Sequence, residues 1–169
     1  IIDKKLNNKF KFFFISGNET TLMLKIKDLV IEHHKLSDAY KTETIKNLKS
    51  LNLDIGLFEN NKLFIVNELS NLDEDFLNKA EKKNEVYVFI SENSPKNKLI
   101  KNIFLRRSDC CLVDCYELTK DSKIKILNQF LKETGLVLEN NVYWLLLEKL
   151  DNKFMFLERE LKKLRELSG

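Results

Sequence analysis

The sequence has no apolar run long enough to cross a lipid bilayer, and no small-residue cleavage site of a secretory signal follows Ile1–Lys5. It has three cysteines, Cys110, Cys111 and Cys115, an odd number crowded into one apolar stretch. Their spacing fits neither a disulfide framework nor a zinc knuckle. We therefore expect small buried thiols in a cytoplasmic protein that does not bind a membrane.

A large excess of one charge is also lacking, because 29 Lys and Arg residues face 26 Asp and Glu residues. No stretch resembles a basic nucleic-acid arm, and we interpret the pairs Lys82–Lys83 and Arg106–Arg107 as solvated helix ends. With 43% hydrophobic and 33% charged residues, the chain suits one soluble globular domain, or a domain and a smaller helical appendage. Since it begins with Ile, we expect a piece of a longer protein.

Residues suited to metal binding or catalysis are scarce. His33 and His34 are the only histidines, and adjacent side chains point in different directions, so they make a poor metal pair. We interpret them as part of a partly exposed strand edge. No Ser, Cys or acidic residue stands in a recognisable nucleophile setting, so the sequence predicts no catalytic residue, no metal site and no cofactor.

The segment Ser16–Met23 follows an apolar run and precedes a helical pattern, as a phosphate-binding loop does. Such a loop needs a second glycine, a lysine that neutralises phosphate and a Ser or Thr for magnesium. The second glycine and the lysine are missing, and Glu19 puts a negative charge where phosphate would lie. The run that would end in a magnesium-binding Asp ends instead in Asn67–Glu68, and a neutral Asn is a poor ligand. We expect no ATP hydrolysis by this chain.

Short apolar runs alternate with helical patterns over most of the sequence. We expect strands over Phe10–Ser16, Lys62–Val66, Val86–Ile90 and Cys110–Cys115. We expect helices over 18–30, around Ile45–Leu51, over Asp73–Lys83 and over Pro95–Phe104, with a short extended piece at His34–Leu36. This alternation is typical of an α/β sandwich built on a largely parallel sheet.

The pattern changes beyond the last of these strands. Apolar residues at helical spacing predict three amphipathic helices, of which the first ends at Gly135 and the last covers Phe154–Leu164. Short links between them indicate a small bundle. We place the boundary near Leu118, with an α/β domain over 1–117 and a three-helix domain over 118–169.

Three large apolar side chains, Ile55, Leu57 and Phe58, lie on the short link before the expected strand Lys62–Val66. Links normally run over the surface, where an apolar cluster often marks a partner site. Apolar residues of this kind also fold inward and join a core. The pattern alone leaves both interpretations open.

Several features taken in order carry a resemblance. They are the opening run Phe12–Gly17 with its single glycine, the step Gly56–Phe58 before Lys62–Val66, the strand end Val88–Ser91 with a lysine-rich helix after it, and the helix Leu157–Leu164. Together they resemble the delta subunit of the bacterial DNA polymerase III clamp loader. The resemblance covers nearly the whole chain, and we expect the family's C-terminal collar domain to be absent from this chain.

The resemblance implies an AAA+-like fold that has lost its ATPase chemistry, followed by a small all-α lid domain. It implies a subunit with no catalytic activity of its own, in an assembly associated with DNA-directed DNA polymerase activity. Its partners would be the sliding clamp (the beta subunit), the other loader subunits and, weakly or indirectly, primer–template DNA. Such a subunit opens the clamp so that it can be loaded onto primed DNA during replication.

In that family an apolar tip enters a hydrophobic cleft of the clamp, and the tip residues fall on Ile55, Leu57 and Phe58 here. Gly56 departs from the Pro or Ser that is more usual between them, which affects the helical shape of the tip. The Arg often found early in the last lid helix has no counterpart near Phe154–Met155, so no role is carried over to that position.

Other readings of the sequence stay open. The delta-prime and ATPase-type loader subunits fit less well, because they typically carry a cysteine zinc module or an intact phosphate loop. From other classes of protein, the alternatives are a nucleotide-dependent enzyme with a divergent phosphate loop and an interaction scaffold that never meets a clamp.

Overall fold

The computed structural model describes residues 10–38, 40–51, 61–70 and 72–168. The chain divides between Cys115 and Tyr116 into two compact units. The part up to Cys115 is called the sheet unit below, and the part from Tyr116 onward the helical unit.

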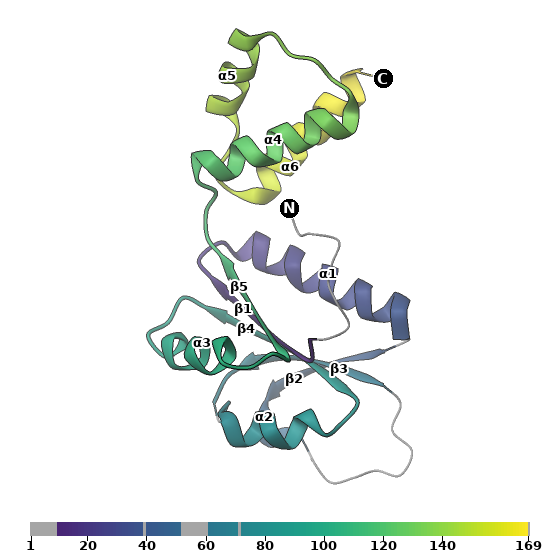
Figure 1. Ribbon diagram of the computed structural model, residues 1–169, viewed down its shortest axis with the longest axis vertical. Coiled ribbons are helices and arrows are strands. Elements are labelled where there is room, and N and C mark those ends of the chain that lie inside the picture. The colour runs from purple at the N-terminus through teal and green to yellow at the C-terminus, as the bar shows by residue number, and fades with distance from the viewer. Residues whose placement is uncertain (1–9, 39, 52–60, 71, 169) are drawn as a thin grey trace. The chain divides into compact units, whose positions relative to one another are not determined.

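A parallel sheet forms the centre of the sheet unit. In the described part of the chain its strands are β1 (Phe12–Gly17), β2 (Lys41–Asn47), β3 (Lys62–Glu68), β4 (Glu85–Glu92) and β5 (Cys110–Cys115). They lie in the order β2-β3-β4-β1-β5, and all the paired neighbours are parallel (Figure 1). The predicted α/β fold with a parallel sheet is therefore confirmed.

Helices cover both faces of this sheet (Figure 1). They are α1 (Thr20–Asp38), α2 (Glu74–Glu81) and α3 (Asn97–Leu105). Successive side chains of a strand point to opposite faces, so Phe12 and Phe14 of β1 pack with residues of α2 and α3, whereas Phe13 and Ile15 pack with residues of α1. Because both faces of the sheet are covered, the sequence of β1 is an almost continuous apolar run.

The helix expected around Ile45–Leu51 is wrong. The segment contributes to β2 at the edge of the sheet, and a short 3-10 turn follows over Leu48–Ser50. An edge strand is only partly buried, so β2 lacks the apolar run that marks the internal strands, while its few apolar residues match helical spacing. Pairing with β3 decides the conformation, and an ion pair between Lys62 and Glu43 at 3.7 Å supports the register.

The extended piece expected at His34–Leu36 is also wrong, because α1 continues through it. The His34 side chain is only 2% exposed, and its ring packs edge-to-face 5.8 Å from the ring of Phe13 and 5.4 Å from that of Tyr40. Both His33 and His34 therefore belong to a helix and not to a strand edge. The burial of one face of α1 against β1 therefore outweighs the local propensity of this segment.

The helical unit contains α4 (Lys120–Thr134), α5 (Asn140–Lys149) and α6 (Phe154–Ser168) in its described part. Its buried core is formed by Leu127, Phe130, Leu147, Leu150, Leu157 and Leu161. The prediction that the first helix ends at Gly135 is confirmed, because this residue has a left-handed φ of 72° and its N–H donates to the carbonyl of Leu131 at 2.9 Å.

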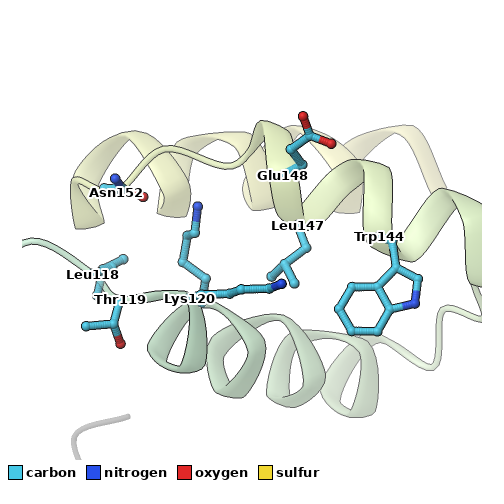
Figure 2. Close-up of a pocket in the computed structure, with 8 residues that line it drawn as sticks. Leu118, Thr119, Lys120, Trp144, Leu147, Glu148 and Asn152 are labelled. Carbon is cyan, nitrogen blue, oxygen red and sulfur yellow. The ribbon is translucent and has the colours of Figure 1, made fainter.

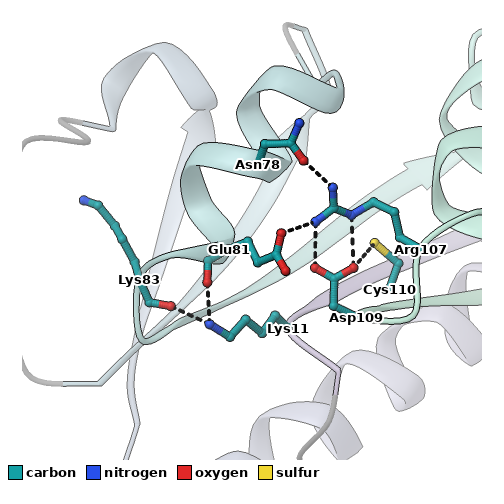
Figure 3. Close-up of polar contacts among 7 residues, drawn as sticks. All are labelled: Lys11, Asn78, Glu81, Lys83, Arg107, Asp109 and Cys110. Atoms are coloured by element: carbon teal, nitrogen blue, oxygen red, sulfur yellow. Dashed lines mark hydrogen bonds and ion pairs between the residues drawn. The ribbon is translucent and has the colours of Figure 1, made fainter.

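A polar network ties the segment before β5 to α2 (Figure 3). The Arg107 guanidinium donates to the two carboxylate oxygens of Asp109 at 3.0 and 2.8 Å and to the carboxylate of Glu81 at 2.9 Å. It also donates to the side-chain oxygen of Asn78 at 2.6 Å. The interpretation of the arginine pair as a solvated helix end holds for the exposed Arg106 but is wrong for Arg107.

These contacts favour the charged forms of both partners. Burial raises the pKa of Asp109, but the hydrogen bonds and the positive charge of Arg107 outweigh it and bring that pKa below its ordinary value. Hydrogen bonds to Asp109 in turn raise the pKa of Arg107. Lys11, just before β1, extends the network by donating to the backbone carbonyls of Glu81 at 2.6 Å and Lys83 at 2.8 Å.

Candidate functional site at the carboxyl edge of the sheet

The residues predicted to bind a partner, Ile55, Leu57 and Phe58, lie outside the described residues, which stop at Leu51 and resume at Asn61. Their role stays a prediction. The described part of the chain does include the second region that the sequence singled out, the turn between β1 and α1.

Because the strands are parallel, their carboxyl ends meet at one edge of the sheet, which is where open α/β folds bind ligands. The turn Gly17–Glu19 lies at this edge and leads directly into α1. In a nucleotide-binding protein the phosphates would lie against such a turn, held by its backbone N–H groups and by the positive end of the helix dipole.

In this protein the backbone of the turn bonds to the neighbouring strand. The N–H groups of Asn18 and Glu19 both donate to the carbonyl oxygen of Cys115, each at 3.0 Å. Gly17 has a φ of 154°, and a Cβ placed on it would lie 1.8 Å from that same carbonyl oxygen. The glycine is therefore required for close packing against β5, and two donors that a phosphate would need are used within the fold.

The Glu19 side chain fills the start of α1. It is only 3% exposed, and its carboxylate accepts hydrogen bonds from the N–H of Thr21 at 3.2 Å and the N–H of Leu22 at 2.7 Å. The hydroxyl of Thr21 donates to it as well, at 2.6 Å. A negative charge is favourable at a helix N-terminus, so this carboxylate occupies the position that suits an anionic ligand.

The sequence indicated the unfavourable charge of Glu19 but not its role. The Glu19 carboxylate caps the helix by accepting two backbone N–H groups of its first turn. The carbonyl of Cys115 carries no signal in the sequence, because any residue at that position would provide one. Only the pairing of β1 with β5 brings the two segments together.

Side chains from the ends of the adjacent strands also bond to one another. Asp114 of β5 pairs with Lys101 of α3 at 2.5 Å and lies 3.5 Å from the hydroxyl of Ser16. On β4, the hydroxyl of Ser91 donates to the side-chain oxygen of Asn97, which is 3% exposed. These hydrogen bonds and the ion pair stabilise the edge of the sheet.

The end of β3 completes this edge. Asn67 stands where a magnesium-binding carboxylate would be needed, and Glu68 pairs with Lys46 of β2 at 3.6 Å. Within the residues that the structure describes, no group of three or more His, Cys, Asp and Glu side chains is arranged to hold a metal ion.

The cysteines of β5 behave as buried side chains. Cys110 and Cys115 are buried, Cys111 is half-buried, and none of the three is in a disulfide. Burial raises the pKa of both Cys110 and Cys115 to about 12, so neither is a ready nucleophile near neutral pH. The prediction of small buried thiols is confirmed for these two. Among the described helices, none is both long and apolar enough to span a membrane.

Comparison of the sequence with family models and with curated proteins gives no match. Comparison of the structure with solved structures gives a clear one, the Bacillus subtilis DNA clamp loader delta protein (YqeN), with a TM-score of 0.62. The chain is similar in fold to a clamp loader delta protein. The match covers 95% of this chain at 13% sequence identity, and the chain spans 54% of the length of that protein.

Two further structures give TM-scores too low to carry an argument. One is described as a DNA replication initiation factor, with a TM-score of 0.40, 18% identity and coverage of 94% of this chain and 54% of that one. The other is the replication initiator DnaA bound to AMPPCP and single-stranded DNA, with a TM-score of 0.39, 17% identity and coverage of 93% and 54%. The resemblance noted in the sequence agrees with the similarity in fold to the clamp loader delta protein alone.

Proposed function

We propose that this chain is a non-ATPase subunit of a clamp loader, similar to the delta subunit, that binds a sliding clamp and opens it for loading onto primed DNA. The observation that carries the proposal is the similarity in fold to a clamp loader delta protein over 95% of the chain. In this role the sheet unit contacts the clamp, the helical unit acts as the lid, and other loader subunits are further partners.

The geometry of the turn after β1 supports a subunit that does not use ATP. A triphosphate would need the N–H groups of Asn18 and Glu19, which donate to Cys115, and it would meet the buried carboxylate of Glu19. Separating these contacts would cost the hydrogen bonds that order the start of α1. A nucleotide-dependent enzyme with a divergent loop is therefore the weaker candidate.

The clamp contact is assigned to Ile55, Leu57 and Phe58. A Leu or Phe side chain that becomes buried in a preformed apolar cleft contributes roughly 1.5–3 kcal/mol, and a few such anchors commonly dominate an interface. Opening of the ring follows if the tip binds the open form more tightly than the closed form, since a ligand shifts an equilibrium only by that difference in affinity.

The test is a calorimetric titration of the full chain with the sliding clamp of the same organism. The double variant Leu57→Ala with Phe58→Ala should weaken binding roughly 100-fold or more, because two anchors are removed. The matched control is Leu99→Ala with Leu105→Ala, which removes two leucines that are each 71% exposed on α3.

Both double variants should retain the thermal unfolding transition of the wild type. Equal affinity of the Leu57→Ala, Phe58→Ala variant and the wild type would refute the assigned tip. Failure of the wild-type chain to bind the clamp at all would instead favour a scaffold that acts elsewhere.

A further inference from the structure

A cavity of about 730 Å³ opens in the helical unit between the start of α4 and the end of α5 (Figure 2). We call it the α4–α5 cavity. Its size falls within the range of sites that hold small molecules in proteins. All of its lining residues belong to the helical unit, and none of them takes part in the contacts described above for the sheet unit.

The wall of the α4–α5 cavity is aromatic and its mouth carries a cation. Trp144, the single tryptophan of the sequence, is 48% exposed and lines the cavity, while Leu147, which also lines it, is 3% exposed. The ammonium of Lys120 lies 5.6 Å from the centre of the Trp144 ring, and Figure 2 shows the two residues on facing helices, Lys120 on α4 and Trp144 on α5. An aromatic face next to a positive charge is the combination that holds a base and its phosphate.

The rest of the lining restricts the ligand further. The second lysine, Lys123, is buried and donates to the backbone carbonyl of Leu150 at 2.9 Å, so it supports the floor. Glu148 and Asn152 also line the cavity, and in Figure 2 the carboxylate of Glu148 points away from Trp144 and Lys120.

We propose that the α4–α5 cavity binds an unstacked nucleobase together with its phosphate, with the base on Trp144 and the phosphate paired with Lys120. The inference rests on the proposed function, in which the chain works beside primed DNA, and it names a nucleic-acid contact in the helical unit. Base stacking on an indole is stronger than the contact of an exposed lysine with that ring, so the ligand displaces Lys120 toward the phosphate.

The charged residues near the cavity favour one direction of approach for a nucleic-acid strand. The adjoining hollow is lined by three acidic residues (Glu117, Glu148 and Asp151) and two lysines (Lys123 and Lys153), so its excess of negative charge disfavours a phosphate chain that continues in that direction. The strand therefore reaches the cavity from one side and inserts a single base. A duplex is a poor ligand because its base faces are already stacked on their neighbours.

Fluorescence of Trp144 tests the proposal directly, since no other tryptophan contributes to the emission. The full chain is titrated with a short single-stranded DNA of mixed sequence, with the same DNA as a duplex, and with nucleoside monophosphates. We expect the single strand to quench Trp144 and the duplex to have little effect. Quenching by monophosphates at similar concentration identifies a free nucleotide as the natural ligand, and quenching by the strand alone identifies single-stranded nucleic acid.

A matched pair of lysine variants tests the role assigned to Lys120. The change Lys120→Gln should weaken binding of the strand about fivefold to tenfold and lower the slope of log affinity against log salt by about one. Lys125→Gln removes an exposed lysine of the same helix that does not line the cavity and should leave affinity within about twofold. Equal effects of the two changes would overturn the assignment of the phosphate to Lys120.

The contribution of Trp144 is tested by the fluorescence anisotropy of a labelled single-stranded DNA. Trp144→Leu should weaken binding about tenfold, whereas Trp144→Phe should retain part of the affinity, because an aromatic face remains. Absence of quenching in the wild type, equal quenching by duplex, or quenching by the clamp alone would each overturn the inference, and the last would mark the cavity as a protein-docking site.

The clamp titration keeps the two proposals apart. Clamp binding without any response of Trp144 to nucleic acid overturns this inference and leaves the proposed function standing. A response to the single strand without clamp binding has the opposite meaning, because it supports the cavity and counts against the loader subunit.

Discussion

The sheet unit and the helical unit both place a helix N-terminus beside polar side chains, but in the described residues the start of α1 is filled by the protein's own groups whereas the start of α4 lines a cavity. At α1 the buried carboxylate of Glu19 takes the position of an anion, and the carbonyl of Cys115 takes two backbone donors. At α4 the hydroxyl of Thr119 accepts the N–H of Ser122 at 3.2 Å, and the α4–α5 cavity opens next to it.

Position in a fold does not by itself make a binding site. The turn after β1 lies where α/β proteins bind nucleotides, yet its donors and its charge are satisfied internally. The helical unit has no such inherited position, yet it exposes Trp144 beside Lys120. An exposed aromatic ring beside a cation and an open hollow are the features that indicate a site in the helical unit.

The largest expected effect comes from Gly17→Ala. The added Cβ would lie 1.8 Å from the carbonyl oxygen of Cys115, and backbone on both sides prevents relaxation, so we expect a loss of about 3 kcal/mol or more of unfolding free energy. Gly135→Ala is the control, since its φ of 72° is strained for alanine but nothing lies within 4 Å, and it should cost about 1 kcal/mol. Urea unfolding followed by circular dichroism measures both, and equal losses would break the closed-turn description.

The next effect concerns the network at the opposite edge of the sheet. Arg107→Gln should cost about 2 kcal/mol near neutral pH, because Asp109 and Glu81 lose a partner in a partly buried site. Because the pKa of Asp109 is lowered in the folded protein, its contribution is present above the ordinary Asp value near 4 and is lost as the pH falls through the lowered value.

The variant should therefore show a flatter decline of stability with acid than the wild type does. Urea unfolding of both proteins at several pH values from neutrality downward gives the two slopes. Parallel declines would mean that Asp109 does not depend on Arg107 for its ionisation.

A smaller effect compares the two helix starts directly. Glu19→Gln should cost about 1.5 kcal/mol, since a charged acceptor of backbone N–H groups is replaced by a neutral one in a buried position. Thr119→Ala removes the corresponding cap of α4 and should cost about 1 kcal/mol. Thermal unfolding ranks the pair, and a larger loss at Thr119 would reverse the comparison.

The smallest expected effect is a null result with nucleotide. ATP with magnesium should shift the midpoint of thermal unfolding of the wild type by less than about 1 °C, because a ligand raises stability only if it binds the folded state. Glu19→Gln should behave in the same way, since the N–H groups of Asn18 and Glu19 still donate to Cys115. A midpoint that rises with nucleotide concentration would instead favour a nucleotide-dependent enzyme.

The internal strands were predictable because burial on both faces leaves a direct mark on composition. The runs around Phe12–Ile15 and Val86–Phe89 are apolar at every position, and both became central strands. The edge strand β2 was missed because it is only partly buried and mostly polar, so its sequence lacks the continuous apolar run of the internal strands. The tip residues Ile55, Leu57 and Phe58 were singled out by sequence and remain a prediction.

By itself the sequence determined the alternation of strands and helices, the stop at Gly135 and the loss of the lysine and second glycine of a phosphate loop. Only the tertiary structure decided how the turn after β1 is closed, because its acceptor is a backbone carbonyl at Cys115, far away in the chain. The same holds for Trp144 and Lys120, which are brought together by the packing of α4 against α5. Local patterns report on burial and propensity, whereas contacts between distant residues exist only once the chain has folded.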